Sequence, residues 1–119
     1  MTRDILEMIQ DLQLDINRDE VREIERYLNS ENDFYVEIDG EEYRFINEDA
    51  IWDIFVDEIQ QLTEECYTGK AEWWIAIDWE QTAENCLEAD GYGHHFASYD
   101  GNEHEYKLGE ENYYIFRTN

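Results

Sequence analysis

The sequence predicts a single α+β domain, residues 1–119, in which helices pack on short antiparallel β-hairpins. The chain is 42% hydrophobic, and 119 residues suffice for one buried core but are too few for two. Some stretches repeat apolar residues at helical spacing, whereas others alternate apolar and polar residues as strands do. The expected order is two helices, two strands, a helix, a strand, a helix and three short strands. This order favours antiparallel pairing.

Two helices are expected at the N-terminal end. The first covers residues 4–16, where apolar residues recur at spacings of four, three and four. The second covers residues 18–28, and Asn17 with Glu20 forms a capping-box pattern in front of it. The residues expected to face inward are Ile5, Ile9, Leu12 and Ile16 in the first helix, and Val21, Ile24, Tyr27 and Leu28 in the second.

A β-hairpin and a long helix follow. Asp39-Gly40 separates alternating runs at 34–38 and 42–46, and Asp-Gly in such a place is a strong hairpin signal. Asn47 is expected to cap a helix over 48–66 that ends at residues 67–70. Its buried residues are expected to be Ile51, Phe55, Ile59 and Leu62, with Trp52 at the edge.

The best-specified stretch is 73–96. Trp73–Ile77 is rich in β-favouring residues and predicts a buried strand, after which Asp78 and Gln81 resemble a capping box. The following helix is expected to bury Trp79, Ala83, Cys86 and Leu87 and to stop at Asp90-Gly91. Strands are expected at 94–99, 104–108 and 113–117, with a turn at 100–102.

The net charge of −24 limits the possible partners. A compact chain of this length has a radius of gyration of roughly 13 to 14 Å, so that as a sphere it is about 35 Å across. A DNA duplex of that length carries about 20 charges. The protein would therefore match DNA in charge per unit length. Such a surface repels nucleic acid and anionic membranes and attracts proteins that bind phosphate.

Carboxylates recur at helical spacing in three rows, with few basic residues near them. Like charges at this spacing cost roughly 0.2 to 0.5 kcal/mol per pair, and four residues of helix span about 6 Å, a spacing similar to that of backbone phosphates. The rows are therefore predicted to bind a partner, with exposed aromatics such as Trp52 or Tyr92 as added anchors. The candidate residues are Asp4, Glu7, Asp11 and Asp15; Asp49, Asp53 and Asp57; and Glu80, Glu84 and Glu88.

Two simpler explanations of the acidity remain open. In the first, the rows are ordinary solvated helix faces. In the second, the acidic composition reflects adaptation to high salt. The small number of lysines, Lys70 and Lys107, fits the second explanation, whereas the abundance of Trp, Tyr and Phe does not.

No motif of a catalytic or cofactor site is present. The sequence has no Walker loop, dinucleotide glycine pattern, HExxH, CxxC or nucleophile elbow, so neither an enzyme nor a cofactor is expected. A metal site is not expected either, because His94 and His95 would point to opposite faces of a strand.

The sequence also predicts the compartment. Neither a signal peptide nor a membrane span is recognisable, which favours the host cell cytosol. Cys66 and Cys86 are read as two reduced thiols, with a disulfide as the alternative.

Two short segments resemble a known family. Ile77-Asp78-Trp79-Glu80 with Ala83, and then Tyr114-Ile115-Phe116-Arg117, resemble the closing region of the ArdA-type antirestriction proteins. The resemblance covers about 40 residues; the insertion at 91–112 and the N-terminal half depart from it. It implies an acidic DNA mimic of phages and mobile elements that occupies the DNA-binding groove of a restriction enzyme.

These observations predict a DNA-mimic inhibitor of a host nucleic-acid-binding defence complex, of the antirestriction or anti-CRISPR type. The expected partner is a basic DNA- or RNA-binding protein, such as a restriction enzyme, a CRISPR effector or a nuclease. Direct binding to nucleic acid or membrane is not expected, and a homodimer would extend the anionic surface. The alternatives are an immunity protein or antitoxin that blocks a basic nuclease toxin, and an acidic adaptor.

Overall fold

The computed structural model describes residues 3–66 and 77–119, and within them the α+β prediction is confirmed. Helices and strands alternate along the chain in pairs before the final hairpin. In chain order they are α1 (Arg3–Leu12), α2 (Arg18–Leu28), β1 (Asp33–Ile38), β2 (Glu41–Asn47), α3 (Glu48–Cys66), α4 (Trp79–Phe96), β3 (His104–Leu108) and β4 (Glu111–Arg117).

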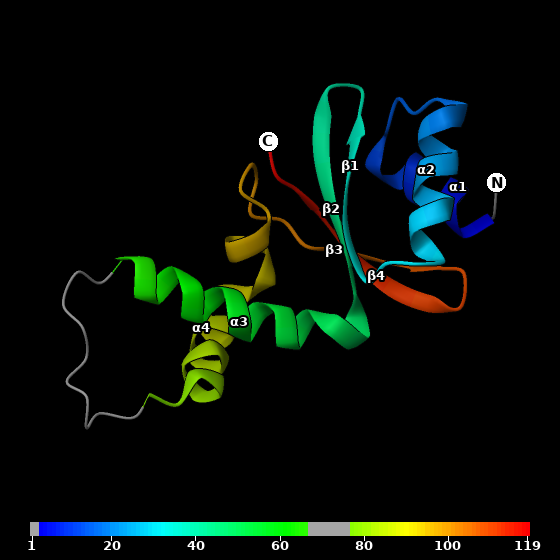
Figure 1. Ribbon diagram of the computed structural model, residues 1–119. Helices are drawn as coiled ribbons and strands as arrows, with labels where there is room; N and C mark the ends of the chain where they lie inside the picture. The colour runs from blue at the N-terminus through cyan, green and yellow to red at the C-terminus, as the bar shows by residue number, and fades with distance from the viewer. Residues whose placement is uncertain (1–2, 67–76) are drawn as a thin grey trace.

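The strands form one antiparallel sheet in the order β1-β2-β4-β3. Two hairpins make up this sheet, and they join along β2 and β4, where Phe45 lies opposite Ile115. Helices α1 and α2 cover one face of the sheet, and α3 and α4 lie on the other (Figure 1). The sheet is therefore the middle layer between two pairs of helices.

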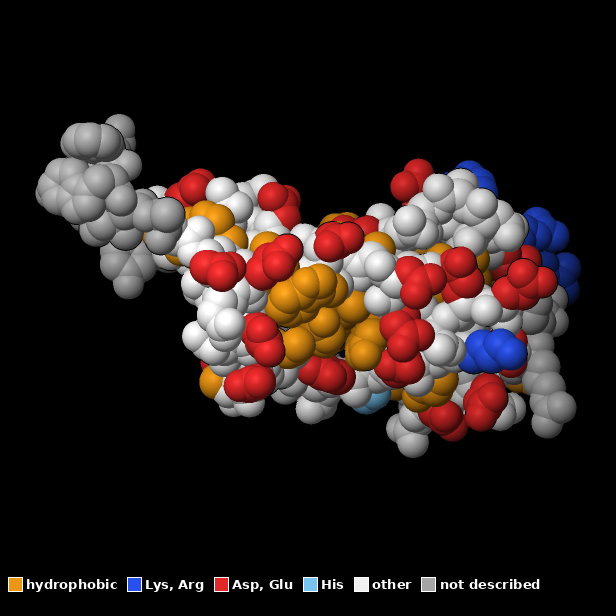
Figure 2. Space-filling view, turned by 90° about the horizontal axis from the view of Figure 1, so that it is seen from below, with side chains coloured by type: hydrophobic (Ala, Val, Ile, Leu, Met, Phe, Trp, Pro, Cys, Tyr) orange, Lys and Arg blue, Asp and Glu red, His pale blue; other side chains and the backbone are white. Residues whose placement is uncertain are grey.

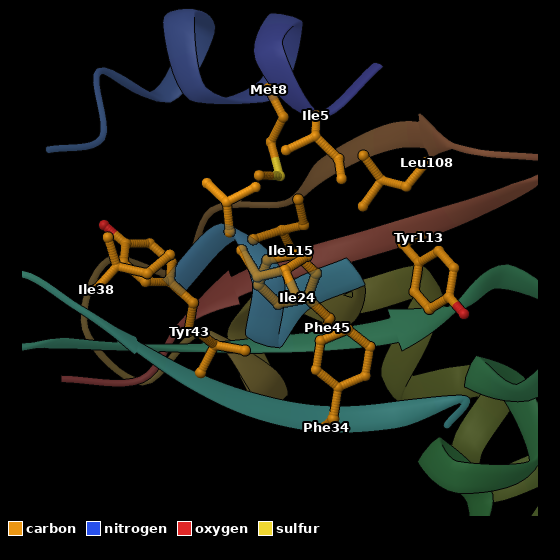
Figure 3. Close-up of a cluster of buried hydrophobic side chains, with 12 residues drawn as sticks. Ile5, Met8, Ile24, Phe34, Ile38, Tyr43, Phe45, Leu108, Tyr113 and Ile115 are labelled. Carbon is orange, nitrogen blue, oxygen red and sulfur yellow. The ribbon is translucent and has the colours of Figure 1, made fainter. Parts of the chain in front are cut away.

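The first hydrophobic cluster lies between the sheet and the N-terminal helices (Figure 3). Phe34 and Phe45 share this face, and their rings stack at 5.0 Å between centroids. Val21 and Ile24 of α2 are buried against it, together with Ile5 of α1. Strand residues on this face alternate with residues that point to the opposite layer, which is the period of two of a β-strand.

The second cluster lies on the other face, where Ile46 and Phe116 meet the long helices. Ile51, Phe55 and Ile59 of α3 are buried there, as predicted. The prediction for Leu62 is wrong, because its side chain is 48% exposed on the end of α3 that projects beyond the sheet (Figure 1). The central strands are thus buried on both faces, which the sequence analysis did not foresee.

The predicted local signals at three element boundaries are confirmed. Asn17 and Glu20 form the reciprocal capping box of α2, and Asn47 Oδ1 accepts the Asp49 N–H at 2.8 Å in the first turn of α3. Asp39 and Gly40 have φ of 50° and 77°, the pair of left-handed residues that a two-residue hairpin of type I′ requires.

Helix α1 is shorter than predicted, because it ends at Leu12 rather than Ile16. Gln13 adopts a left-handed φ of 54°, and its N–H donates to Gln10 O. The next N–H, of Leu14, donates to Ile9 O at 3.0 Å. These two bonds are the Schellman pattern of a helix end, which usually has glycine in place of Gln13. Asp15 therefore lies outside the helix.

The region around α4 also differs from the prediction. Asp78 caps the helix, because its side chain accepts the Gln81 N–H at 3.0 Å. Gly91 interrupts it with φ 75° and ψ 176°, but a further helical segment continues to Phe96, so the strand predicted at 94–99 is wrong. The strand predicted at Trp73–Ile77 and the helix end at 67–70 lie outside the described residues, except that Ile77 is 43% exposed and not in a strand.

The molecule is more elongated than a sphere of this length. The radius of gyration of the Cα atoms is 16.4 Å, above the expected value, and the molecule measures 54 × 27 × 23 Å. A duplex 54 Å long carries about 32 charges. The net charge of −24 therefore corresponds to about three quarters of the charge density of DNA along this axis, rather than to an equal density.

The end of α1 gives a first testable prediction. Gln13→Gly is expected to raise the free energy of unfolding by about 0.5 to 1 kcal/mol, because glycine adopts the left-handed conformation without a Cβ clash. Gln10→Gly, on the exposed side of the same helix, is the control and is expected to lower it by about 1 kcal/mol. Urea denaturation measures both. A destabilising effect of Gln13→Gly would contradict the assigned helix end.

Candidate partner-binding surface

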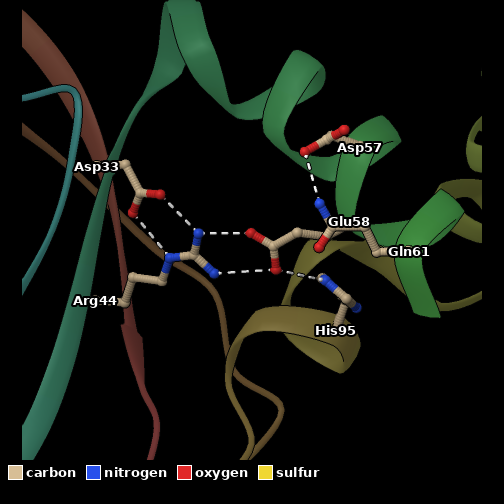
Figure 4. A network of polar contacts seen from close by, with 6 residues as sticks. All are labelled: Asp33, Arg44, Asp57, Glu58, Gln61 and His95. Atoms are coloured by element: carbon tan, nitrogen blue, oxygen red, sulfur yellow. Dashed lines mark hydrogen bonds and ion pairs between the residues drawn. The ribbon is translucent and has the colours of Figure 1, made fainter. Parts of the chain in front are cut away.

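Arg44 of β2 connects the sheet to α3 and α4, the helices on the side of the second cluster (Figure 4). Its side chain is only 9% exposed, and the guanidinium binds two carboxylates, each through two hydrogen bonds. Asp33 of β1 accepts at 2.7 and 2.8 Å, and Glu58 of α3 accepts at 2.6 and 3.2 Å. Glu58 Oε1 also lies 3.1 Å from Nε2 of His95 in α4. One buried arginine thus fixes the position of α3, and through Glu58 that of α4.

These contacts change the pKa values of the residues involved. Burial alone would lower the pKa of Arg44, but its hydrogen bonds with Asp33 and Glu58 outweigh burial and raise it. Burial alone would raise the pKa of Glu58, but hydrogen bonds with His95 and Arg44 lower it to about 2. Both groups are therefore charged at neutral pH, and the pair is a permanent ion pair of the core.

The rows on α3 and α4 lie where the sequence predicted them. All six carboxylates, those of Asp49, Asp53, Asp57, Glu80, Glu84 and Glu88, are on exposed side chains. On α3 the three aspartates share one face, because positions four apart lie above one another. This face is turned away from Phe55 and Ile59, because each aspartate is two residues, or about half a turn, from a buried residue. One of them, Asp57, accepts a hydrogen bond from Gln61 at 3.2 Å, and this bond also stays on the surface of the helix.

The row on α1 is less regular. Glu7 and Asp11 are exposed and Asp4 is half-buried, whereas Asp15 lies in the link between α1 and α2. Asp11 lies near Tyr106 of β3, where burial and then the negative charge of Asp11 raise the pKa of Tyr106. The structure thus keeps three of the four predicted residues on one helix and leaves Asp15 out of the row.

Removing Asp15 from its row also changes the cost of the rows. An intact first row would add the pair 11/15 and give seven adjacent like-charge pairs in the three rows. Six pairs remain, namely 4/7, 7/11, 49/53, 53/57, 80/84 and 84/88. Their repulsion costs about 1 to 3 kcal/mol in total. This cost is a considerable part of a net stability of about 5 to 15 kcal/mol.

The charge is distributed unevenly between the two helical layers. Ranges 48–64 and 77–106 contain fourteen Asp or Glu residues and no Lys or Arg. Exposed arginines instead lie on α2, at positions 18, 22 and 26. Figure 2 shows acidic side chains as separate points along the whole length of one face, and Lys and Arg side chains gathered toward one end. The layer of α3 and α4 is therefore the anionic side of the molecule.

The aromatic residues proposed as exposed anchors are in fact half-buried. Trp52 stacks on Phe55 with 6.3 Å between ring centroids, and Tyr92 meets Phe55 edge-on at 5.2 Å. The kink at Gly91 places Tyr92 there, and Glu103 stabilises the kink by accepting the Gly93 N–H at 2.9 Å. Glu103 was not predicted from the sequence, because its partner Gly93 is ten residues away along the chain and beyond the predicted helix stop.

The residues considered for metal or disulfide chemistry lie in separate places. His95 is bound to Glu58, and His104 is in β3. Cys86 is a free, half-buried thiol, whereas the side chain of Cys66 is not among those that the structure describes. Among the residues described, no three His, Cys, Asp or Glu side chains are arranged to hold a metal ion. In the same part of the chain, no helix combines the length and the apolar character that a membrane span requires.

Comparison with protein-family models, with curated protein sequences and with solved structures finds no match to this chain. The function must therefore be inferred from the surface itself.

Glu58 gives a prediction on pH dependence. Its folded-state pKa of about 2 is below its ordinary value of 4.5, so its contribution to stability is present above about pH 5 and is lost as the pH falls toward 2. Glu58→Gln is expected to lower the free energy of unfolding by about 3 kcal/mol at pH 7. The difference from the natural protein should shrink between pH 5 and about 2.

Urea denaturation at several pH values measures this difference, in which the effects of the other carboxylates largely cancel. Asp57→Asn removes the neighbouring, exposed carboxylate and is the matched control, for which a small difference at every pH is expected. Equal effects of the two substitutions at pH 7 would contradict the structural role of Glu58.

Proposed function

We propose that this protein is a DNA mimic that inhibits a basic nucleic-acid-binding protein of a host defence system. The observation that carries this proposal is the anionic layer, in which α3, α4 and the following chain display carboxylates without a single Lys or Arg in ranges 48–64 and 77–106. Such a layer suits a groove lined with Lys and Arg, where carboxylates take the places of phosphates.

The rigidity of the layer supports the proposal. Regularly spaced charges imitate phosphates only if their scaffold holds them in place, because flexible acidic chains lose entropy on binding. Here α3 is fixed by Arg44 through Glu58 and by the burial of Phe55 in the second cluster. The carboxylates at 49, 53 and 57 are therefore presented at the pitch of a fixed helix. Association with a basic groove is expected to be fast and to weaken as salt increases.

The resemblance to ArdA-type antirestriction proteins points to the same class of target. It is carried by Ile77–Glu80 with Ala83 at the start of α4, and by Tyr114–Arg117 in β4. On this basis the target is a restriction enzyme, a CRISPR effector or another DNA-binding protein. The protein acts in the host cytosol by competition and not by catalysis.

An immunity protein that blocks one nuclease toxin is the second candidate. It is favoured by the concentration of acidic residues without Lys or Arg in one layer, since a single cognate nuclease needs only one acidic patch. The two candidates differ in what displaces the partner. Duplex DNA should displace the partners of a DNA mimic, whereas an immunity protein should retain a single nuclease from a toxin-producing strain.

The proposal is tested by retention of proteins from a lysate of bacteria that carry restriction and CRISPR systems. The protein is immobilised, and the retained proteins are eluted with duplex DNA. Reversal of the α3 row, in the variant with Asp49, Asp53 and Asp57 each changed to Lys, is expected to abolish retention of the DNA-eluted proteins. The fold should be unchanged or more stable, because like-charge repulsion along α3 is relieved.

The matched control reverses three acidic residues on the side of α1 and α2: Asp19 and Glu23 of α2, and Glu110 in the turn between β3 and β4. It changes the net charge by the same amount. Retention should persist if the anionic layer is the binding surface. If both variants lose retention equally, only total charge matters and the proposal fails.

A further inference from the structure

Three half-buried aromatic residues gather on the anionic side of the molecule, two from its helices and one from the strand that they cover. They are Trp52 of α3, Tyr92 of α4 and Tyr114 of β4, which we call the aromatic patch. Phe55 contacts two of them, with ring centroids 6.3 Å from Trp52 and 5.2 Å from Tyr92. Tyr92 and Tyr114 are themselves 5.6 Å apart. Tyr92 and Tyr114 thus form a pair, Trp52 is linked to this pair through Phe55, and all three rings pack on the second cluster rather than standing as isolated side chains.

Carboxylates border the aromatic patch. Glu105 is the cross-strand neighbour of Tyr114, and burial, followed by Glu105 and the nearby Glu48, raises the pKa of Tyr114. The pKa of Tyr92 is raised by burial and by Glu103. Glu48 is one helical turn before Trp52 and also lies near Tyr114, so it borders two of the three rings. Figure 2 shows such an apolar patch enclosed by acidic side chains in the middle of the molecule.

This arrangement is unlike the other exposed apolar side chains. These are Leu6, Tyr35, Leu62, Ile77 and Tyr99, which lie on separate parts of the chain; Arg44 lies over the ring of Tyr35 and Arg117 over that of Tyr99. Single exposed hydrophobic residues are normal on a protein surface, whereas a contiguous patch with a polar rim is the anatomy of a binding interface. A solvated acidic face requires no such patch.

The charge of the rim determines what can cover it. A second copy of this chain would bring its own carboxylates against Glu48, Glu103 and Glu105, and like charges in an interface disfavour association. A partner with Lys or Arg around an apolar side chain satisfies both parts of the surface. Its apolar group would cover the rings while its cations face the carboxylates, so that the pairs at the rim are partly shielded from water.

We propose that the aromatic patch is the centre of the partner-binding face and receives an apolar side chain flanked by Lys and Arg in the groove of the target protein. This inference rests on the proposed function and adds the residue that the target must supply. The carboxylate rows then set the rate and the salt dependence of association, whereas the patch sets the lifetime of the complex.

Two synthetic peptides test the inference without knowledge of the target. One is rich in lysine and carries a single tryptophan at its centre, and the other has glycine in that place. Binding is measured by calorimetry at several salt concentrations. The tryptophan peptide is expected to bind about tenfold more tightly. The salt dependence of the two affinities should be the same, because both peptides carry the same charge.

Variants locate the binding. Trp52→Ala is expected to remove the tenfold difference, whereas Tyr99→Ala, an exposed aromatic outside the patch, should preserve it. Because Trp52→Ala also weakens the packing on Phe55, the natural protein supplies a second measurement. The indole N–H signal of Trp52, assigned by its absence in Trp52→Phe, should shift with the tryptophan peptide and not with the glycine peptide.

The outcomes separate the two proposals. Equal affinities together with an unchanged Trp52 signal would overturn the role of the aromatic patch and leave the DNA-mimic proposal standing. If neither peptide binds even at low salt, the anionic layer does not attract a basic groove, and the proposed function fails as well.

Discussion

Arg44 is buried between two carboxylates that belong to different layers of the molecule, and the geometry of the anionic side depends on this contact. Arg44 of β2 binds Asp33 of the neighbouring strand β1 and Glu58 of α3. Glu58 in turn contacts His95 of α4. Burying a charge is favourable only when its hydrogen bonds are satisfied, and the fork of the guanidinium matches both carboxylates. In a chain with eight Lys and Arg residues and thirty-two Asp and Glu residues, one cation is thus used inside the fold.

The remaining charge divides the protein into two unlike sides. The side of α1 and α2 carries exposed arginines, whereas the side of α3 and α4 carries carboxylates that repel one another. Adaptation to concentrated salt gives no reason for this division, because salt acts on every face alike. An interface that selects a basic partner explains the division, because only the face that meets the partner needs to be anionic. The repulsion along the helices is offset by the burial of Phe55, Phe96 and Phe116 in the second cluster.

The sequence predicted most elements from short-range patterns. Asp39-Gly40 located the first hairpin, Asn17 and Glu20 began α2, and the spacing of Ile51, Phe55 and Ile59 defined the buried face of α3. The errors have long-range or unusual local causes. Gln13 ends α1 in a conformation that usually marks glycine. At Gly93 a Cβ would lie 2.2 Å from Gly101 O, so the second segment of α4 depends on a close contact with a distant turn.

The sequence by itself determined the acidity, the positions of the carboxylate rows and the absence of Lys and Arg from ranges 48–64 and 77–106, because composition and helical period are local properties. Only the tertiary structure decided which rows share a side, that Asp15 leaves its helix, and that Glu58 turns inward to Arg44. It also brought Trp52, Tyr92 and Tyr114 together from three elements. The packing of two helix pairs on opposite faces of one sheet sets these contacts, and no pattern along the chain encodes the face that each pair covers.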